Sequence, residues 1–136
     1  MQNADLILIP LLDGTYLRAQ VDSVTPHFAG LMLSDQVVTA DASPKALTNA
    51  DIVALIAVTP NDIPWPVIGY DAVPRLKIPD HAPHDPAIAE ALANAIIGLY
   101  PWDGFPDPAF FTNFLRDPDT VPSRARTSAD LPKSDL

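Results

Sequence analysis

The residues best suited to chemistry lie in one short stretch of the chain. His81 and His84 stand beside Asp80 and Asp85, and two imidazoles with a carboxylate can hold a metal ion. Pro83 separates the two histidines, however, and no further ligand pair follows at a known spacing. We therefore interpret the stretch as a solvated connector, with a metal site as the alternative.

Other routes to catalysis have less support. Cysteine is absent, and no Gly-x-Ser-x-Gly turn is present to expose a nucleophilic serine. The 5 glycines are too far apart to form a phosphate-binding loop. The acidic residues include no pair that stands out as an acid and base. The sequence predicts a protein that is not an enzyme and needs no cofactor.

The acidic composition points to a protein partner. The net charge is −9, and Asp+Glu number 17 against 8 Lys+Arg. Residues 1–74 carry eight aspartates against Arg18 and Lys45. Such a surface repels nucleic acid and anionic lipid, and it speeds association with a basic partner. Solubility alone is the alternative explanation of this charge.

The first half of the chain reads as a series of strands. Asp13-Gly14, set between apolar segments, predicts a two-residue hairpin turn. The strand after it alternates apolar with polar residues, as expected for a strand with one buried and one solvent-exposed face. Ser43-Pro44 predicts a short helical turn. The expected strands are residues 6–9, 16–24, 28–33, 36–39, 52–59 and, at a sheet edge, 65–70.

The second half reads as helical after a proline-rich connector at residues 74–84. Asp85-Pro86 predicts a helix start, and its apolar stripe is Ile88, Leu92, Ile96 and Leu99. Asp107-Pro108 predicts a second helix, whose aromatic face is formed by Phe110, Phe111, Phe114 and Leu115.

The predicted fold class is α+β: an antiparallel sheet or partial barrel of about five to six strands, followed by two C-terminal helices. We expect one domain over residues 1–116, with a β-rich part at 1–74 and a helical part at 85–116. Residues 117–136 have no periodicity and are expected to form a flexible C-terminal tail.

The location is predicted to be cytoplasmic. No apolar run approaches the roughly 20 residues of a membrane span, and the first residues lack the basic and apolar blocks of a signal peptide. Contact with a membrane is not expected.

The tryptophans have two interpretations. Trp65 lies between two prolines on an expected edge strand, and Trp102 lies in a loop near Phe105. If exposed, such rings would be anchors for a partner. Alternatively, each ring covers one end of the core.

The first half of the chain resembles the immunity protein 26 family of bacterial polymorphic-toxin systems. The resemblance covers roughly residues 5–75. The segments that carry it are Ile7-Leu8-Ile9-Pro10-Leu11, Asp13-Gly14-Thr15-Tyr16, Pro44-Lys45-Ala46-Leu47, the strand from Ile52 to Val58, and Trp65-Pro66-Val67-Ile68-Gly69 ahead of Val73-Pro74.

The resemblance implies an immunity-type protein that neutralises a cognate bacterial toxin by direct binding. A toxin with a basic cleft would be met by acidic side chains near turns or on the wet face of the sheet. The expected partner-binding residues are Asp13, Asp22, Asp35, Asp62 and Trp65. The alternative is a non-catalytic adaptor or subunit that docks through its aromatic helix and C-terminal tail. The oligomeric state stays open.

Overall fold

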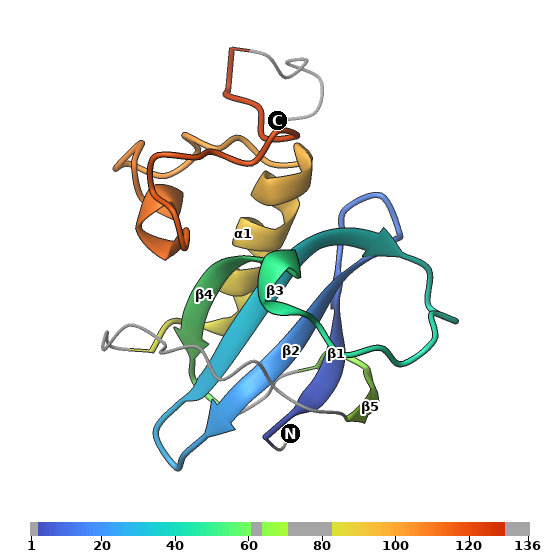
Figure 1. Ribbon diagram of the computed structural model, residues 1–136. Coiled ribbons are helices and arrows are strands. Elements are labelled where there is room, and N and C mark those ends of the chain that lie inside the picture. Colours follow the sequence, from blue (N-terminus) through green and yellow to red (C-terminus); the bar gives the residue numbers. More distant parts are fainter. Residues whose placement is uncertain (1–2, 61–63, 71–82, 130–136) are drawn as a thin grey trace.

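The computed structural model describes residues 3–60, 64–70 and 83–129, and its centre is one antiparallel sheet (Figure 1). The strand order is β4-β3-β2-β1-β5, so four strands follow one another as a meander and β5 returns beside β1. The strands are β1 (Asp5–Pro10), β2 (Tyr16–Val24), β3 (Ala29–Val38), β4 (Ile52–Val58) and β5 (Val67–Tyr70). The helical elements are the 3₁₀ turn η1 (Asn49–Asp51), the helix α1 (Pro86–Ile97) and the 3₁₀ turn η2 (Phe111–Phe114). The predicted α+β class is confirmed.

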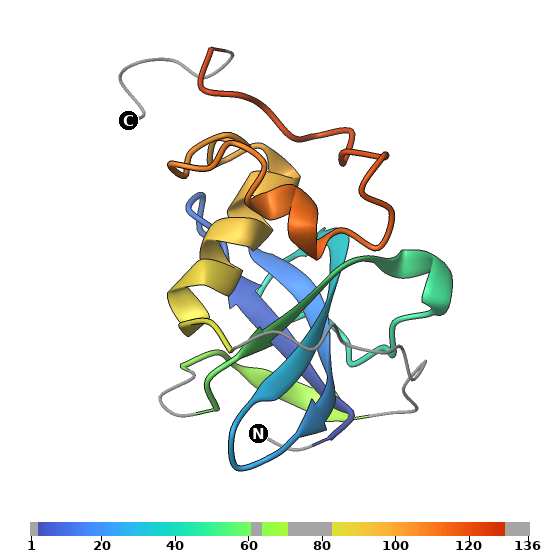
Figure 2. The same cartoon turned by 90° about the vertical axis from the view of Figure 1, so that its left-hand side faces the viewer.

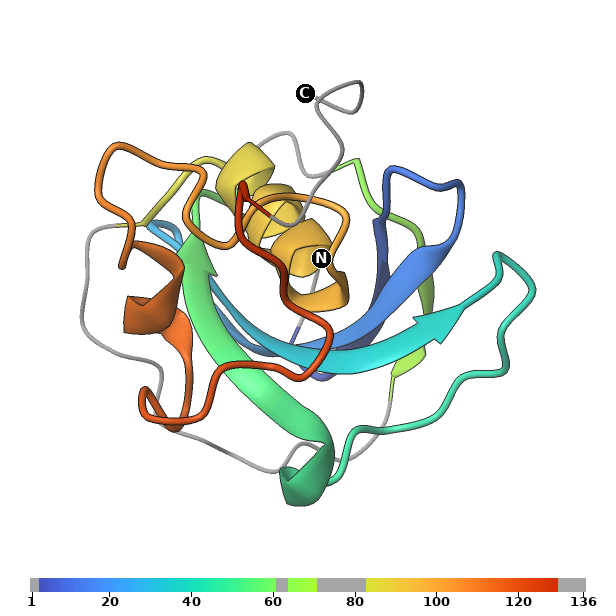
Figure 3. The same cartoon turned by 90° about the horizontal axis from the view of Figure 1, so that it is seen from above.

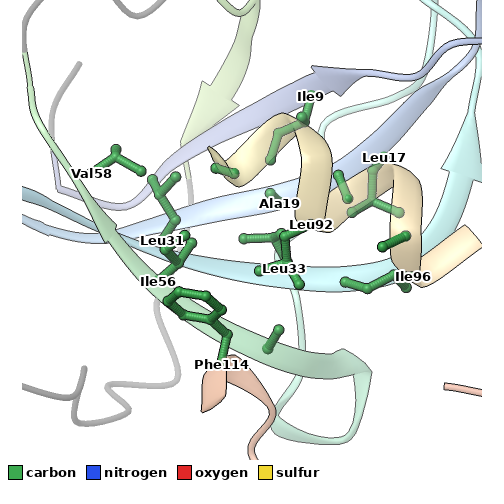
Figure 4. Packing of buried hydrophobic residues seen from close by; sticks show 14 of the residues in the cluster. Ile9, Leu17, Ala19, Leu31, Leu33, Ile56, Val58, Leu92, Ile96 and Phe114 are labelled. Carbon is green, nitrogen blue, oxygen red and sulfur yellow. The ribbon is translucent and has the colours of Figure 1, made fainter. Parts of the chain in front are cut away.

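The sheet curves around α1, which lies in its concave side (Figures 2 and 3). Among the described strands the sheet stays open, because β4 and β5 stand at opposite ends of the strand order. Alternate residues of β1, β2, β3 and β4 point to the helix, as strand geometry requires. These side chains form one apolar core, shown in part in Figure 4: Ile9, Leu17, Ala19, Leu31, Leu33, Ile56 and Val58 from the strands, and Leu92 and Ile96 from α1.

Local signals explain both ends of α1. The Asp85 side chain accepts a hydrogen bond from the backbone N–H of Ala87 at 2.9 Å, and Pro86 occupies the first turn. Gly98 ends the helix with a φ of 88°, a left-handed conformation that glycine adopts without strain. Among the described residues, no helix has the length and apolar character needed to cross a membrane.

The predicted second C-terminal helix is wrong: the described chain holds only the 3₁₀ turn η2 in its place. Leu115 has a φ of −69° and a ψ of 141°, which is extended rather than helical. It forms a bridge with Ala54 of β4, and the N–H of Arg116 donates to the carbonyl oxygen of Val53. Pairing with the edge of β4 therefore ends the turn before a helix can form.

Two predictions about turns also need correction. The β1–β2 hairpin exists, but its loop is longer than two residues: the Gly14 N–H donates to the Leu11 carbonyl, and only Gly14 within it has a positive φ. No helical turn forms at Pro44. The turn comes later as η1, where Asp51 accepts two hydrogen bonds from Thr48. The expected strands at 28–33 and 36–39 are one strand, β3, with an irregularity after Leu33.

The outer face of β2 is covered by residues 39–48, although the sequence predicts this face to be solvent-exposed. Arg18 is 8% exposed and Gln20 is fully buried. The guanidinium group of Arg18 donates to the Ser43 carbonyl, and the Gln20 amide oxygen accepts from the Leu47 N–H. Residues 39–48 therefore form a second layer over this face, and polar side chains beneath it satisfy backbone groups of that layer. A small apolar cluster lies on the same side, formed by Met32, Leu47, Ile52 and Leu55.

Candidate functional site

The predicted partner-binding residues do not lie together. Asp13 in the β1–β2 loop and Asp35 in β3 are exposed, whereas Asp22 in β2 is half-buried. Asp62 lies outside the described residues. Trp65 is only 4% exposed. The structure therefore leaves Asp13 and Asp35 as surface carboxylates of the predicted set.

The strand register separates these residues into two ends of the sheet. Tyr16 at the start of β2 pairs with Val38 at the end of β3, so Asp13 and Asp35 lie toward the same end. Ser34 pairs with Ile52, which places the residue before β4, Asp51, at this end too. Asp22 follows the pair Val21–Leu31 and lies toward the other end.

Two aspartates that the sequence analysis did not select join Asp13 and Asp35. Asp41 follows β3 and Asp51 closes η1, and both connect to the same end of the sheet. We call Asp13, Asp35, Asp41 and Asp51 the acidic end. In Figure 1 the β1–β2 loop and the end of β3 lie at the upper right of the sheet, and η1 lies nearer the centre of the view. Asp13, Asp35 and Asp41 are exposed, and Asp51 is half-buried.

Threonines hold three of the four carboxylates. Asp13 accepts from the N–H of Thr15 at 3.0 Å and from its hydroxyl. Asp41 accepts from the hydroxyl of Thr39. Asp51 accepts from the Thr48 N–H at 2.8 Å and from its hydroxyl at 2.9 Å. In each case a single carboxylate oxygen accepts these threonine hydrogen bonds.

These hydrogen bonds favour the charged form of each carboxyl group. The Thr15 hydroxyl and then its N–H hold the pKa of Asp13 below its usual value, and the Thr39 hydroxyl does the same for Asp41. The pKa of Asp51 is lowered first by the Thr48 backbone and hydroxyl, with a smaller contribution from the charges of Lys45 and Arg18. Asp13, Asp41 and Asp51 are therefore anionic at neutral pH.

Asp35 and Asp51 flank one paired position of the sheet. Asp35 follows Ser34 in β3, and Asp51 precedes Ile52, the partner of Ser34 in β4. Carboxylates gathered toward one end of a sheet are suited to binding Lys or Arg on a protein surface.

Trp65 has a structural role instead of being an exposed anchor. Its indole N–H donates to a carboxylate oxygen of Glu90 in α1 at 2.7 Å, and its ring belongs to the main core. Trp102 is likewise only 7% exposed. The alternative interpretation of the tryptophans, in which each covers one end of the core, is the one the structure supports.

The signal for Asp51 was present in the sequence. Thr48-x-x-Asp51 has the spacing of a capping box, in which the acidic residue reaches back to the N-cap backbone. Thr39-x-Asp41 and Asp13-x-Thr15 share a shorter spacing that suits a local side-chain hydrogen bond. That these three pairs meet at one end depends on the strand register, which no local pattern reveals.

The His81–Asp85 stretch is described only from residue 83 onward. His84 joins β4 through its backbone, since its N–H donates to the Ala57 carbonyl at 2.9 Å. Its ring packs edge-on against Phe114, with 5.2 Å between ring centres, and Asp85 caps α1. The described residues contain no group of three or more His, Cys, Asp and Glu that could hold a metal ion.

Comparison of the chain with protein-family models, with curated proteins and with solved structures gives no match.

Proposed function

We propose that the protein binds a basic protein partner through its acidic end, and that this partner is a bacterial toxin that it neutralises. The observation that carries the binding proposal is the acidic end itself, where threonines orient Asp13, Asp41 and Asp51 and lower their pKa values. The toxin as partner rests on the resemblance of residues 5–75 to the immunity protein 26 family.

The physical basis is electrostatic complementarity. Carboxylates held by the protein's own threonines lose little side-chain entropy when a partner's Lys or Arg arrives. Arg18, Lys45 and Arg116 are the nearby positive charges: Lys45 and Arg18 act on Asp51, and the Arg116 guanidinium donates to the Asn49 carbonyl. The four carboxylates of the acidic end outnumber these three cations by one, so this end attracts a cationic surface over about a Debye length.

The adaptor function has less support. Its proposed aromatic helix is a 3₁₀ turn, and the side chains of Phe111 and Phe114 are buried in the core. Rings packed in this way are not available to a second protein without unfolding the segment. We therefore retain toxin neutralisation as the leading proposal. A cytoplasmic location is part of that proposal.

The test compares two fourfold Asp→Asn variants. One neutralises the acidic end at Asp13, Asp35, Asp41 and Asp51. The control neutralises the same number of exposed or half-exposed aspartates elsewhere, at Asp103, Asp107, Asp117 and Asp119. Asn retains an oxygen acceptor, so the local hydrogen bonds from threonine and serine survive in both variants.

The tagged wild-type chain and both variants are used to capture partners at low and high salt, and the captured proteins are identified. The wild type and control should retain one stoichiometric basic protein, and suppress its toxicity on co-expression. Each rim pair contributes about 0.2–1 kcal/mol, so the loss of four pairs should weaken binding by roughly 4-fold to about 700-fold. Equal binding by both variants, with equal salt dependence, would refute the role of the acidic end. A partner that is not toxic would refute neutralisation alone.

A further inference from the structure

Residues 117–129, the described part of the predicted flexible tail, cross the molecule beside the C-terminal end of α1 (Figures 1 and 3). We call residues 117–129 the strap. At its start the preceding residue, Arg116, is fixed to β4 through the Val53 carbonyl. Near its end the strap is fixed again, to the loop that follows α1. Val121, between these two ends, is 49% exposed.

The second attachment consists of identifiable hydrogen bonds. The N–H of Trp102 donates to the carbonyl oxygen of Arg126 at 2.7 Å. The N–H and hydroxyl of Ser128 donate to one carboxylate oxygen of Asp103 at 2.8 and 2.9 Å. Ala125 packs against the main core, which contains Trp102. A short run of the strap, residues 125–128, therefore makes these contacts with the loop and the core.

Gly98 makes close approach of the strap possible. A Cβ atom added at Gly98 would lie 2.3 Å from the carbonyl oxygen of Arg124, a backbone atom that cannot move unless the strap moves. Gly98 also has a φ of 88°, so a side chain here meets two obstacles. Gly14 has a φ of 87° but no atom within 4 Å of an added Cβ, which makes it a matched control for the backbone strain alone.

The buried ring beside the strap keeps one unsatisfied group. The indole nitrogen of Trp102 is buried and has no hydrogen-bond partner in the described structure. A buried donor without an acceptor destabilises the state that contains it.

We propose that the strap is a releasable latch: residues 125–128 open as a unit while the sheet and α1 stay folded, and opening gives access to the Trp102 side of the core. The two hydrogen bonds to Asp103 are exposed to solvent, and Ala125 is the residue of this run that packs against the core. A segment with exposed hydrogen bonds and few buried apolar contacts is the kind of structure that opens at low free energy. This inference is independent of the acidic end and of the proposed toxin partner.

The test is amide hydrogen exchange of the full chain followed by NMR. The N–H groups of Trp102 and Ser128 report on the latch, and those of β2 paired with β3 report on global unfolding. In the wild type we expect the two latch amides to share one protection factor, at least about 100-fold below that of the core amides. Latch amides as protected as the core would overturn the proposal, because the strap would then open only with the whole fold.

Two pairs of variants separate the latch from general destabilisation. Gly98→Ala should lower the ratio of latch to core protection factors at least tenfold, whereas Gly14→Ala should leave this ratio unchanged. Asp103→Ala should lower the same ratio at Trp102 as well as at Ser128, whereas Asp13→Ala, which also removes a local hydrogen-bonded carboxylate, should not. If Asp103→Ala deprotects Ser128 but not Trp102, the two attachments are not one unit and the proposal fails.

Discussion

The hydrogen bond between Trp65 and Glu90 joins two segments that are far apart in the sequence, and its contribution to stability can be measured. The Trp65 ring is 4% exposed, and its indole N–H donates to a Glu90 oxygen at 2.7 Å. Replacing Trp65 by Phe keeps an aromatic ring but removes the only donor of that side chain. The change tests whether this bond fixes residues 64–70 against α1.

The expected change in the free energy of unfolding is the sum of a lost hydrogen bond and a partial cavity. A hydrogen bond to a charged group contributes about 1.5–3 kcal/mol. Glu90 is half-buried, so water can reach its carboxylate after the change and the low end of that range applies. The smaller ring also leaves a partial cavity, which adds about 1 kcal/mol. Trp65→Phe should therefore lower the free energy of unfolding by about 2–3 kcal/mol.

A double-mutant cycle isolates the bond from the cavity. Urea unfolding of Trp65→Phe, Glu90→Ala and the double variant should give a coupling energy of about 1–2 kcal/mol. Glu90→Gln keeps an oxygen acceptor and should cost less than Glu90→Ala. Trp102→Phe is the matched control: its indole N–H has no partner in the described structure, so its effect should add to that of Glu90→Ala. A Trp65–Glu90 coupling below about 0.5 kcal/mol would refute the bracing role of this bond.

Three further predictions concern the core, the sheet edge and pH. Leu92→Ala, at a fully buried site facing the sheet, should destabilise the protein by about 2–5 kcal/mol, while Leu12→Ala at a side chain 72% exposed should change it by less than about 0.5 kcal/mol in chemical denaturation. Gly69→Ala should cost about 1–3 kcal/mol and lower the melting temperature, because its Cβ would lie 2.9 Å from the Cβ of Pro44, a stiff ring; an unchanged melting temperature would contradict this contact. Aspartates whose folded-state pKa is lowered stabilise the protein fully above their unfolded pKa of about 4 and lose that contribution as pH falls through the folded pKa values. The urea midpoint should thus drop as the pH falls below about 4, and it should drop less when these groups are replaced by Asn; they are Asp13, Asp41, Asp51 and Asp103.

Short-range patterns in the sequence determined the elements that depend on neighbouring residues. Asp85-Pro86 and Gly98 set the ends of α1, because capping involves groups within one turn of the helix. The Asp13-Gly14 pair marks the β1–β2 hairpin, since glycine accepts the positive φ that the loop needs. The apolar run from Ile52 to Val58 is β4. From these pieces the α+β class could be predicted without tertiary information.

Long-range packing decided the features that sequence reasoning predicted wrongly. Arg18 and Gln20 alternate with apolar residues and were expected to face water, but residues 39–48 cross over them and take their hydrogen bonds. The aromatic segment was expected to be a helix, but Leu115 and Arg116 pair with the edge of β4. This pairing ends the helical segment after one 3₁₀ turn. In each case a segment distant in sequence supplied the partner that local patterns could not specify.

The candidate site shows the same division. The sequence by itself determined that the chain is strongly acidic, that nearly all of its carboxylates are aspartates, and that threonines stand two or three residues from several of them. Only the tertiary structure decided which carboxylates share a surface: the register between β2, β3 and β4 brings Asp13, Asp35 and Asp51 toward one end and sends Asp22 toward the other. The physical reason is that a hydrogen bond between neighbours is set by a few backbone angles, whereas the sum of charges on a surface depends on how whole strands pair.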